Sequence, residues 1–160
     1  MATEGRKLIF CIDTSSIIEA RSVRYPVPVF PSLWEKIEKA ISQANIISPE
    51  IVRDELKRND PACYTWAKNQ SGLFIPPDDA LIKGVQAVLK SHRKLVDENL
   101  SYDQADPYVI SLAQLRECTV VTEEKPGPSK RKDKIPDVCK SLGVRVTTFI
   151  GMVEEFGWRF

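Results

Sequence analysis

An unbroken run of apolar residues, Leu8 to Ile12, ends abruptly at Asp13. Such a run suits a strand that is buried on both faces, as in a parallel sheet covered by helices. Asp13 would then follow the carboxyl end of a central strand, where open α/β sheets bind ligands. A simpler explanation stays open, because Asp13 or one of the hydroxyl residues 14–16 is able to cap the helix that begins near Ile17.

Short apolar stretches and amphipathic segments alternate through the rest of the chain. Further strands are predicted at residues 45–48, 73–75, 119–122 and 144–149. Helices are predicted between them, at residues 33–41, 49–59, 63–69, 78–89, 105–115, 136–143 and 152–156. We expect an irregular, proline-rich connection at residues 21–31, and a cap at Ser48 for the helix that follows it. This alternation indicates an α/β fold whose strands pair in parallel.

The composition is ordinary for a globular domain and limits the kind of site. The length predicts one domain over residues 1–160, and the formal net charge of +1 means that any basic surface must be local. The only histidine is His92 and the cysteines form no close pair, so no zinc site is expected. We expect no signal peptide, no membrane span, and a cytoplasmic location with reduced thiols at Cys11, Cys63, Cys118 and Cys139.

Acidic residues recur at the predicted strand ends and in the helices that follow them. The first strand is followed by Asp13, and the fourth is followed by Glu123 and Glu124. Glu55 and Asp106 lie in helices, Asp106 at the very start of its own. Because the carboxyl ends of parallel strands all face one way, these carboxylates are able to gather in one crevice.

Gathered carboxylates repel each other and raise each other's pKa unless a cation lies among them. Ligation by oxygen alone favours Mg²⁺ or Mn²⁺, ions that lower the pKa of a bound water and clamp a phosphodiester. Each acid also has a purely structural explanation. Glu55 is able to lie on the exposed side of its helix, Asp106 to cap its helix, and Glu123 and Glu124 to be solvated loop charges.

Four segments, in this order and spacing, resemble the PIN domain, and more narrowly the small prokaryotic PIN-like proteins grouped with toxins of VapC type. The likeness covers nearly the whole chain. It rests on Asp13-Thr14-Ser15, Ser48-Pro49 with Glu55-Leu56, Ala105-Asp106-Pro107-Tyr108-Val109, and Val120-Val121-Thr122-Glu123-Glu124. The family implies a three-layer α/β/α fold with a central parallel sheet, and a Mg²⁺- or Mn²⁺-dependent endoribonuclease site.

The resemblance also implies roles for individual residues. Asp13, Glu55 and Asp106 match three acids that bind the metal and act in catalysis. The fourth acid of the family usually occurs as Thr-x-Asp, and here Glu124 stands at that place with a longer side chain. An outer set is expected to orient the ligands or water by hydrogen bonds, namely Thr14, Ser15, Asp103, Thr122 and Glu123.

A basic loop takes the place of the compact turn that the family has after the fourth acid. Residues 125–134 hold one acid, Asp133, and five basic residues, Lys125, Lys130, Arg131, Lys132 and Lys134. Beside an acidic crevice, these cations would hold RNA phosphates while the metal acts on one of them. The alternative is a solvated loop without a binding role.

Several other enzymes fit less well. A phosphatase of the haloacid dehalogenase type needs a second aspartate two residues after Asp13, where this chain has Ser15, and no glycine-rich phosphate loop is present. The serious rival is a PIN-like fold with a silent site, kept as an RNA-binding or protein-interaction module. As partners, the resemblance implies an RNA substrate, an antitoxin protein if the chain is a toxin, and a second copy in a homodimer.

Overall fold

The computed structural model of the protein describes residues 8–100, 103–128 and 133–160. The described residues form a parallel sheet in the order β3-β2-β1-β4-β5, with β1 at its centre. The strands are β1 (Phe10–Ile12), β2 (Ile46–Pro49), β3 (Phe74–Ile75), β4 (Thr119–Val121) and β5 (Val146–Thr147). The predicted central position of the first strand is therefore confirmed.

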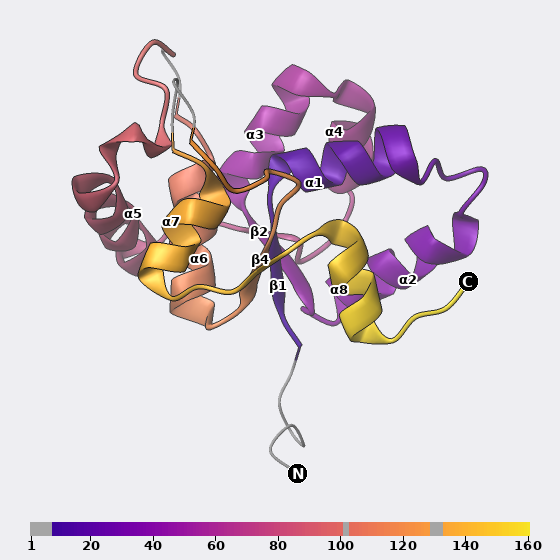
Figure 1. Ribbon diagram of the computed structural model, residues 1–160. Helices are drawn as coiled ribbons and strands as arrows, with labels where there is room; N and C mark the ends of the chain where they lie inside the picture. Colours follow the sequence, from indigo (N-terminus) through magenta and orange to yellow (C-terminus); the bar gives the residue numbers. More distant parts are fainter. Residues whose placement is uncertain (1–7, 101–102, 129–132) are drawn as a thin grey trace.

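Helices cover both faces of this sheet, as Figure 1 shows, with α6 and α7 on one side and α2 and α8 on the other. The α-helices are α1 (Thr14–Ile18), α2 (Pro31–Ser42), α3 (Glu50–Asn59), α4 (Pro61–Ala67), α5 (Asp79–Ser91), α6 (Asp106–Arg116), α7 (Ile135–Leu142) and α8 (Phe149–Phe156). The expected three-layer α/β/α arrangement is confirmed. Among the described residues, no helix has the length and apolar character needed to cross a membrane.

Alternate side chains of β1 point toward the two helical layers that cover the sheet. Cys11 points toward α6, where its Sγ donates to the carbonyl of Val109 at 3.5 Å. Phe10 points the other way and its ring meets Phe156 of α8 edge-on, with 5.0 Å between the centroids. The strand is buried along its whole length because both of its faces are covered by helices.

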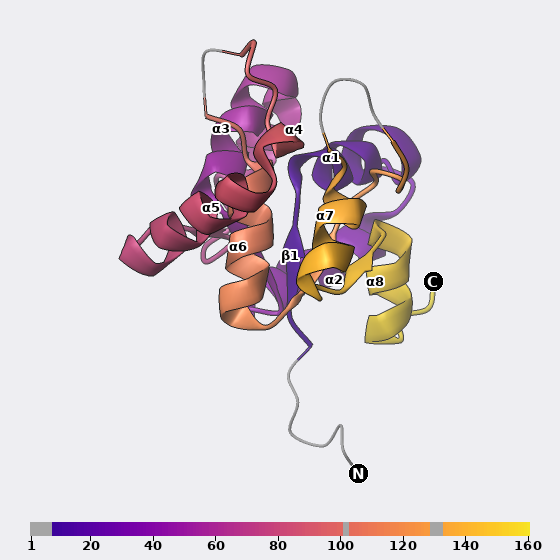
Figure 2. The ribbon, with the colours of Figure 1, turned by 60° about the vertical axis from the view of Figure 1, so that its left-hand side comes forward.

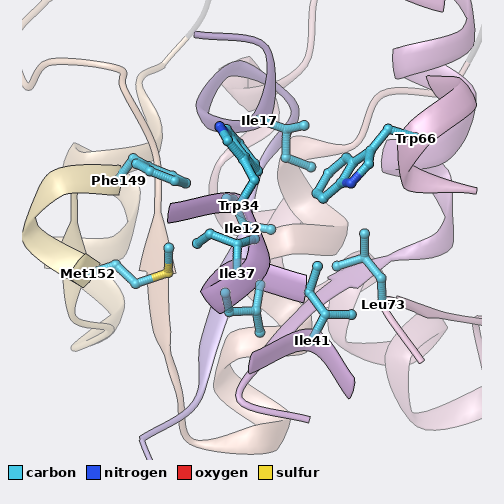
Figure 3. A pocket seen from close by; sticks show the side chains of 10 residues that line it. Ile12, Ile17, Trp34, Ile37, Ile41, Trp66, Leu73, Phe149 and Met152 are labelled. Carbon is cyan, nitrogen blue, oxygen red and sulfur yellow. The ribbon is translucent and has the colours of Figure 1, made fainter. Parts of the chain in front are cut away.

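The core between the sheet and the layer of α2 and α8 is purely apolar. Trp34 and Phe149 stack in it with their ring centroids 5.8 Å apart. Figure 3 shows the side chains that converge there from β1, α1, α2, α4 and α8. They leave a void of about 10 Å³, which holds at most one water molecule, so this cavity is no ligand site.

The helix α5 packs along α6 on the outer side of the molecule, as Figure 2 shows. Close approach of the two helices depends on Gly84, because a Cβ at that position would lie 3.0 Å from Ser111 Oγ. The packing holds α6 firmly against β1, β2 and β4, and thereby fixes the start of α6 at the carboxyl edge of the sheet.

Three local predictions were wrong. The connection after α1 is not irregular throughout, because residues Glu19–Arg24 form a π-helix, η1. Ser48 does not cap α3; its hydroxyl donates to the carbonyl of Ile12 at 2.7 Å and so joins β2 to β1. The last strand is shorter than residues 144–149, and α8 begins at Phe149 instead of 152, since Thr148 caps it by accepting from the N–H of Gly151.

Candidate active site

Side chains from four parts of the chain line one pocket at the carboxyl edge of the sheet, the upper end of β1 in Figure 1. The pocket has a volume of about 260 Å³. Its acids are Asp13 after β1, Glu55 of α3, Asp106 at the start of α6 and Glu124 after β4. The pocket is completed by Thr14, Ser15, Ile18 and Asn59.

Asp13 is both the cap of α1 and a wall of this pocket. Its Oδ1 accepts from the backbone N–H of Ser16 at 2.8 Å, and both of its oxygens accept from the hydroxyl of Ser15, at 2.9 and 3.0 Å. Its own N–H donates to the carbonyl of Val121 at 3.0 Å, which fixes Asp13 against the end of β4. The cap and the site are thus the same carboxylate, so the capping explanation does not exclude a role in the pocket.

The environment of Asp13 disfavours its charged form. Only 3% of this residue is exposed, and burial is the main reason why its pKa rises from 3.8 to about 7. Repulsion from the carboxylate of Asp106 acts in the same direction. Three hydrogen bonds oppose the rise, those from Thr122, Ser16 and Ser15. A buried carboxylate beside a second one is an environment that a cation would relieve.

Glu55 is fixed by two hydrogen bonds and does not point away from the protein. Thr14 Oγ1 donates to its Oε1 at 2.6 Å, and the N–H of Ala105 donates to its Oε2 at 2.8 Å. The first bond reaches α1 and the second reaches the residue before α6. Glu55 therefore joins three helices at the pocket, and the alternative explanation, a simple exposed position on α3, does not hold.

Asp106 does not occupy the capping position of its helix. Ala105 does, and its side chain makes no capping hydrogen bond. Asp106 is the first helical residue, followed by Pro107, whose missing N–H costs nothing in a first turn. A carboxylate at this place also meets the positive end of the helix dipole, which stabilises negative charge in the pocket.

The side chains of the two glutamates after β4 contact different parts of the protein. The carboxylate of Glu123 accepts from the N–H of Phe149 at 2.9 Å, at the start of α8. Glu124 lines the pocket with the other acids, and its N–H donates to Thr122 Oγ1 at 3.1 Å. The N–H of Glu123 donates to Ser15 Oγ at 3.4 Å, so this loop is tied to the residue that also binds Asp13.

Other residues predicted for the site lie elsewhere. Asp103 is exposed and lines a separate groove between α5 and α6. Lys125 is exposed, Lys134 directly precedes α7 and makes no side-chain capping hydrogen bond, and neither residue lines the acidic pocket. The remaining basic residues of the loop, Lys130, Arg131 and Lys132, lie outside the described residues.

Two residues of the pocket were not predicted from the sequence. Ile18, at the end of α1, is half-buried and gives the pocket an apolar wall. Asn59 ends α3, four residues after Glu55 and therefore on the same helix face. The helical spacing from Glu55 was the available signal for Asn59. It was missed because an asparagine at a helix end is ordinary.

The donor atoms of the acids are all oxygens, which suits a hard divalent ion. Within the described ranges, however, no three or more His, Cys, Asp or Glu side chains are grouped as they would be to hold a metal ion among themselves. Mg²⁺ in proteins commonly keeps several waters and takes only one or two carboxylates directly. The pocket therefore fits a largely hydrated ion better than a closed cage of four carboxylates.

Comparison with known proteins supports the fold. The crystal structure of FitAcB from Neisseria gonorrhoeae matches 86% of this chain and 96% of its own, with 18% identical residues and a TM-score of 0.51. This likeness shows a PIN-like three-layer fold. No curated protein matches the sequence. Residues 10–160 match the family described as Domain of unknown function (DUF4411), and because this match covers nearly the whole chain, the protein belongs to that family.

Proposed function

We propose that this protein is a metal-dependent ribonuclease that hydrolyses RNA phosphodiesters at the acidic pocket. One observation carries the proposal: carboxylates from four separate parts of a PIN-like fold line a single pocket, and one of them is buried with a pKa raised to about 7. A stability argument alone gives no reason to gather them, because like charges in one pocket repel. Binding of a divalent cation gives such a reason.

In this proposal the acids have different tasks. Asp13 and Asp106 are the direct ligands of Mg²⁺ or Mn²⁺, since their charges already interact. Glu55 and Glu124 hold the waters around the ion. When bound, the ion supplies a water of lowered pKa and neutralises charge on the phosphodiester.

The rest of the pocket keeps these groups in place. Thr14 and the N–H of Ala105 hold the carboxylate of Glu55, and Ser15 holds Asp13. Such supporting hydrogen bonds orient ligands, and their loss typically costs about 10- to 100-fold in metal affinity or activity. The positive end of α6 favours negative charge at Asp106 and on a phosphate beside it.

The direct test is cleavage of single-stranded RNA by the purified chain with Mn²⁺ or Mg²⁺. We expect cleavage that stops when EDTA is added, and that is lost in Asp13→Asn and Glu55→Gln. Asp54→Asn is the matched control, because Asp54 is an exposed neighbour of Glu55 on α3. Cleavage that persists in EDTA, or in Asp13→Asn, would contradict the proposal.

A second candidate is a silent PIN-like module that binds RNA or a protein without cleaving. Two observations favour it: glutamate replaces the usual fourth aspartate, and the described acids form no closed metal cage. This candidate predicts RNA retention with neither cleavage nor stabilisation by Mn²⁺. If the ribonuclease is the toxin of a toxin–antitoxin pair, we also propose an antitoxin partner, a homodimer and a cytoplasmic location. These three properties rest on the sequence resemblance.

A further inference from the structure

The acidic pocket has one side that the proposed metal chemistry does not use. Ile18 and Asn59 form it, each as the last residue of its helix, on α1 and α3. The two helices lie against each other, and both side chains line the same pocket. The chain continues from Ile18 directly into η1. An apolar side chain offers no ligand to a cation, and a neutral amide adds no charge that would attract one.

Asn59 lines the pocket with an exposed side chain. Within the described part of the chain its amide makes no hydrogen bond. It lies four residues after Glu55, about 6 Å further along the helix axis. That separation leaves room for a ribose between a phosphate at the acids and a base at Asn59.

The chemistry of this pair suits a nucleobase. An amide offers one donor beside one acceptor, which is the pairing that reads adenine in a duplex groove. Adenine matches it on two edges, because its amino group lies between two ring nitrogens that accept, whereas cytosine matches it on one. Ile18 offers an apolar surface for the face of a base. In single-stranded RNA the bases are splayed out and both of these contacts are open to them.

We propose that Ile18 and Asn59 form a base-binding subsite that selects adenine next to the scissile phosphate. This inference rests on the proposed ribonuclease function, and it names the specificity residue of that site. Asn59 is a specificity-determining residue and takes no part in the chemistry. The simpler explanation, an asparagine that merely ends a helix, predicts no effect on base preference.

The test compares cleavage of single-stranded RNA oligonucleotides that differ in one base beside a single cleavage position. We expect the wild type to prefer adenine, and Asn59→Ala to lose about fivefold or more of that preference, the low end for one bidentate base contact. Asn59→Asp offers only acceptors, so its preference should move toward guanine, which presents two donors on one edge. Asn69→Ala is the matched control, an exposed asparagine just beyond α4.

Two readouts separate this inference from the function on which it rests. If the wild type cleaves but Asn59→Ala keeps the same base preference, the subsite is wrong and the nuclease stands. If nothing is cleaved, binding of adenine-rich and uridine-rich oligonucleotides in EDTA decides. A preference for adenine that Asn59→Ala removes then supports the subsite without the nuclease, and equal binding overturns the subsite.

Discussion

Asp13 shows how one residue serves both stability and the site. As the cap of α1, Asp13 accepts a hydrogen bond from the N–H of Ser16 and stabilises the helix. As a buried carboxylate, its charged form is disfavoured and destabilises the fold. The sequence predicted its position, because an acid directly after a buried central strand lies at the carboxyl edge of the sheet. The sequence did not predict that the hydroxyl of Ser15 would bind both of its oxygens, which depends on the local backbone path.

The raised pKa of Asp13 makes the stability of the metal-free protein depend on pH. Its folded pKa of about 7 lies above the ordinary 3.8, so the folded state holds this proton more tightly than the unfolded state does. Its contribution to stability is therefore fully present below pH 3.8 and is lost as the pH rises through 7. Each unit of pKa difference corresponds to about 1.4 kcal/mol.

We predict that Asp13→Asn, which keeps a good cap, gains stability relative to the wild type as the pH rises from 4 to 8. Denaturant unfolding in EDTA at several pH values measures the difference in the free energy of unfolding. In Asp54→Asn, the exposed control, this difference should stay flat. A difference for Asp13→Asn that is also flat across this range would mean that Asp13 is ionised normally in the fold.

The pocket is assembled by hydrogen bonds between helices that are distant in sequence. Glu55 of α3 accepts from Thr14 of α1 and from the residue that precedes α6. The predicted parallel pairing of the strands indicated that the segments after the strands meet at one edge of the sheet. Their exact bounds were not predictable, because Ser48 prefers the carbonyl of β1 to the start of α3, and the π-helix η1 has no simple apolar period.

We predict that Thr14→Val, which keeps the shape of the side chain, weakens Mn²⁺ binding about 10-fold or more by leaving Glu55 without one donor. Hydrogen bonds to charged groups contribute about 1.5–3 kcal/mol, so the metal-free protein should also lose stability of that order. Thr14→Ser restores the hydroxyl and should restore both properties. Calorimetric titration with Mn²⁺ measures the affinity, and equal affinities for the valine and serine variants would contradict the role of this bond.

For the molecule as a whole, the parallel α/β fold predicted from the alternation of strands and helices is confirmed, and so is the three-layer α/β/α arrangement that the family resemblance implied. The site was predicted less completely. Asp13 and the two glutamates were found through their positions after strands, and Glu55 and Asp106 through the resemblance to the PIN domain. The choice between Glu123 and Glu124 depends on a loop that turns one side chain to α8 and the other to the pocket. Asn59 carried no chemical signature of its own.

The net charge of +1 leaves RNA affinity to local cations, and the basic loop is the densest group of them. We predict that neutralising Lys130, Arg131 and Lys132 together weakens RNA binding and flattens its salt dependence. For single strands each phosphate contact contributes about 0.7 to the slope of log K against log salt, so the slope should fall by up to about 2. Mn²⁺ affinity should not change. An unaltered slope would show that the loop does not touch the RNA backbone.

The central claim, a shared metal site among the pocket acids, is tested most directly by thermal melts of the wild type and Asp106→Asn with and without Mn²⁺. Without the ion, the variant should be at least as stable as the wild type, because it relieves repulsion with Asp13. With Mn²⁺ at a hundredfold excess over its Kd, the wild type should gain about 2.7 kcal/mol and the variant should lose most of that gain. If the wild type gains no more from Mn²⁺ than Asp106→Asn does, the shared metal site is wrong.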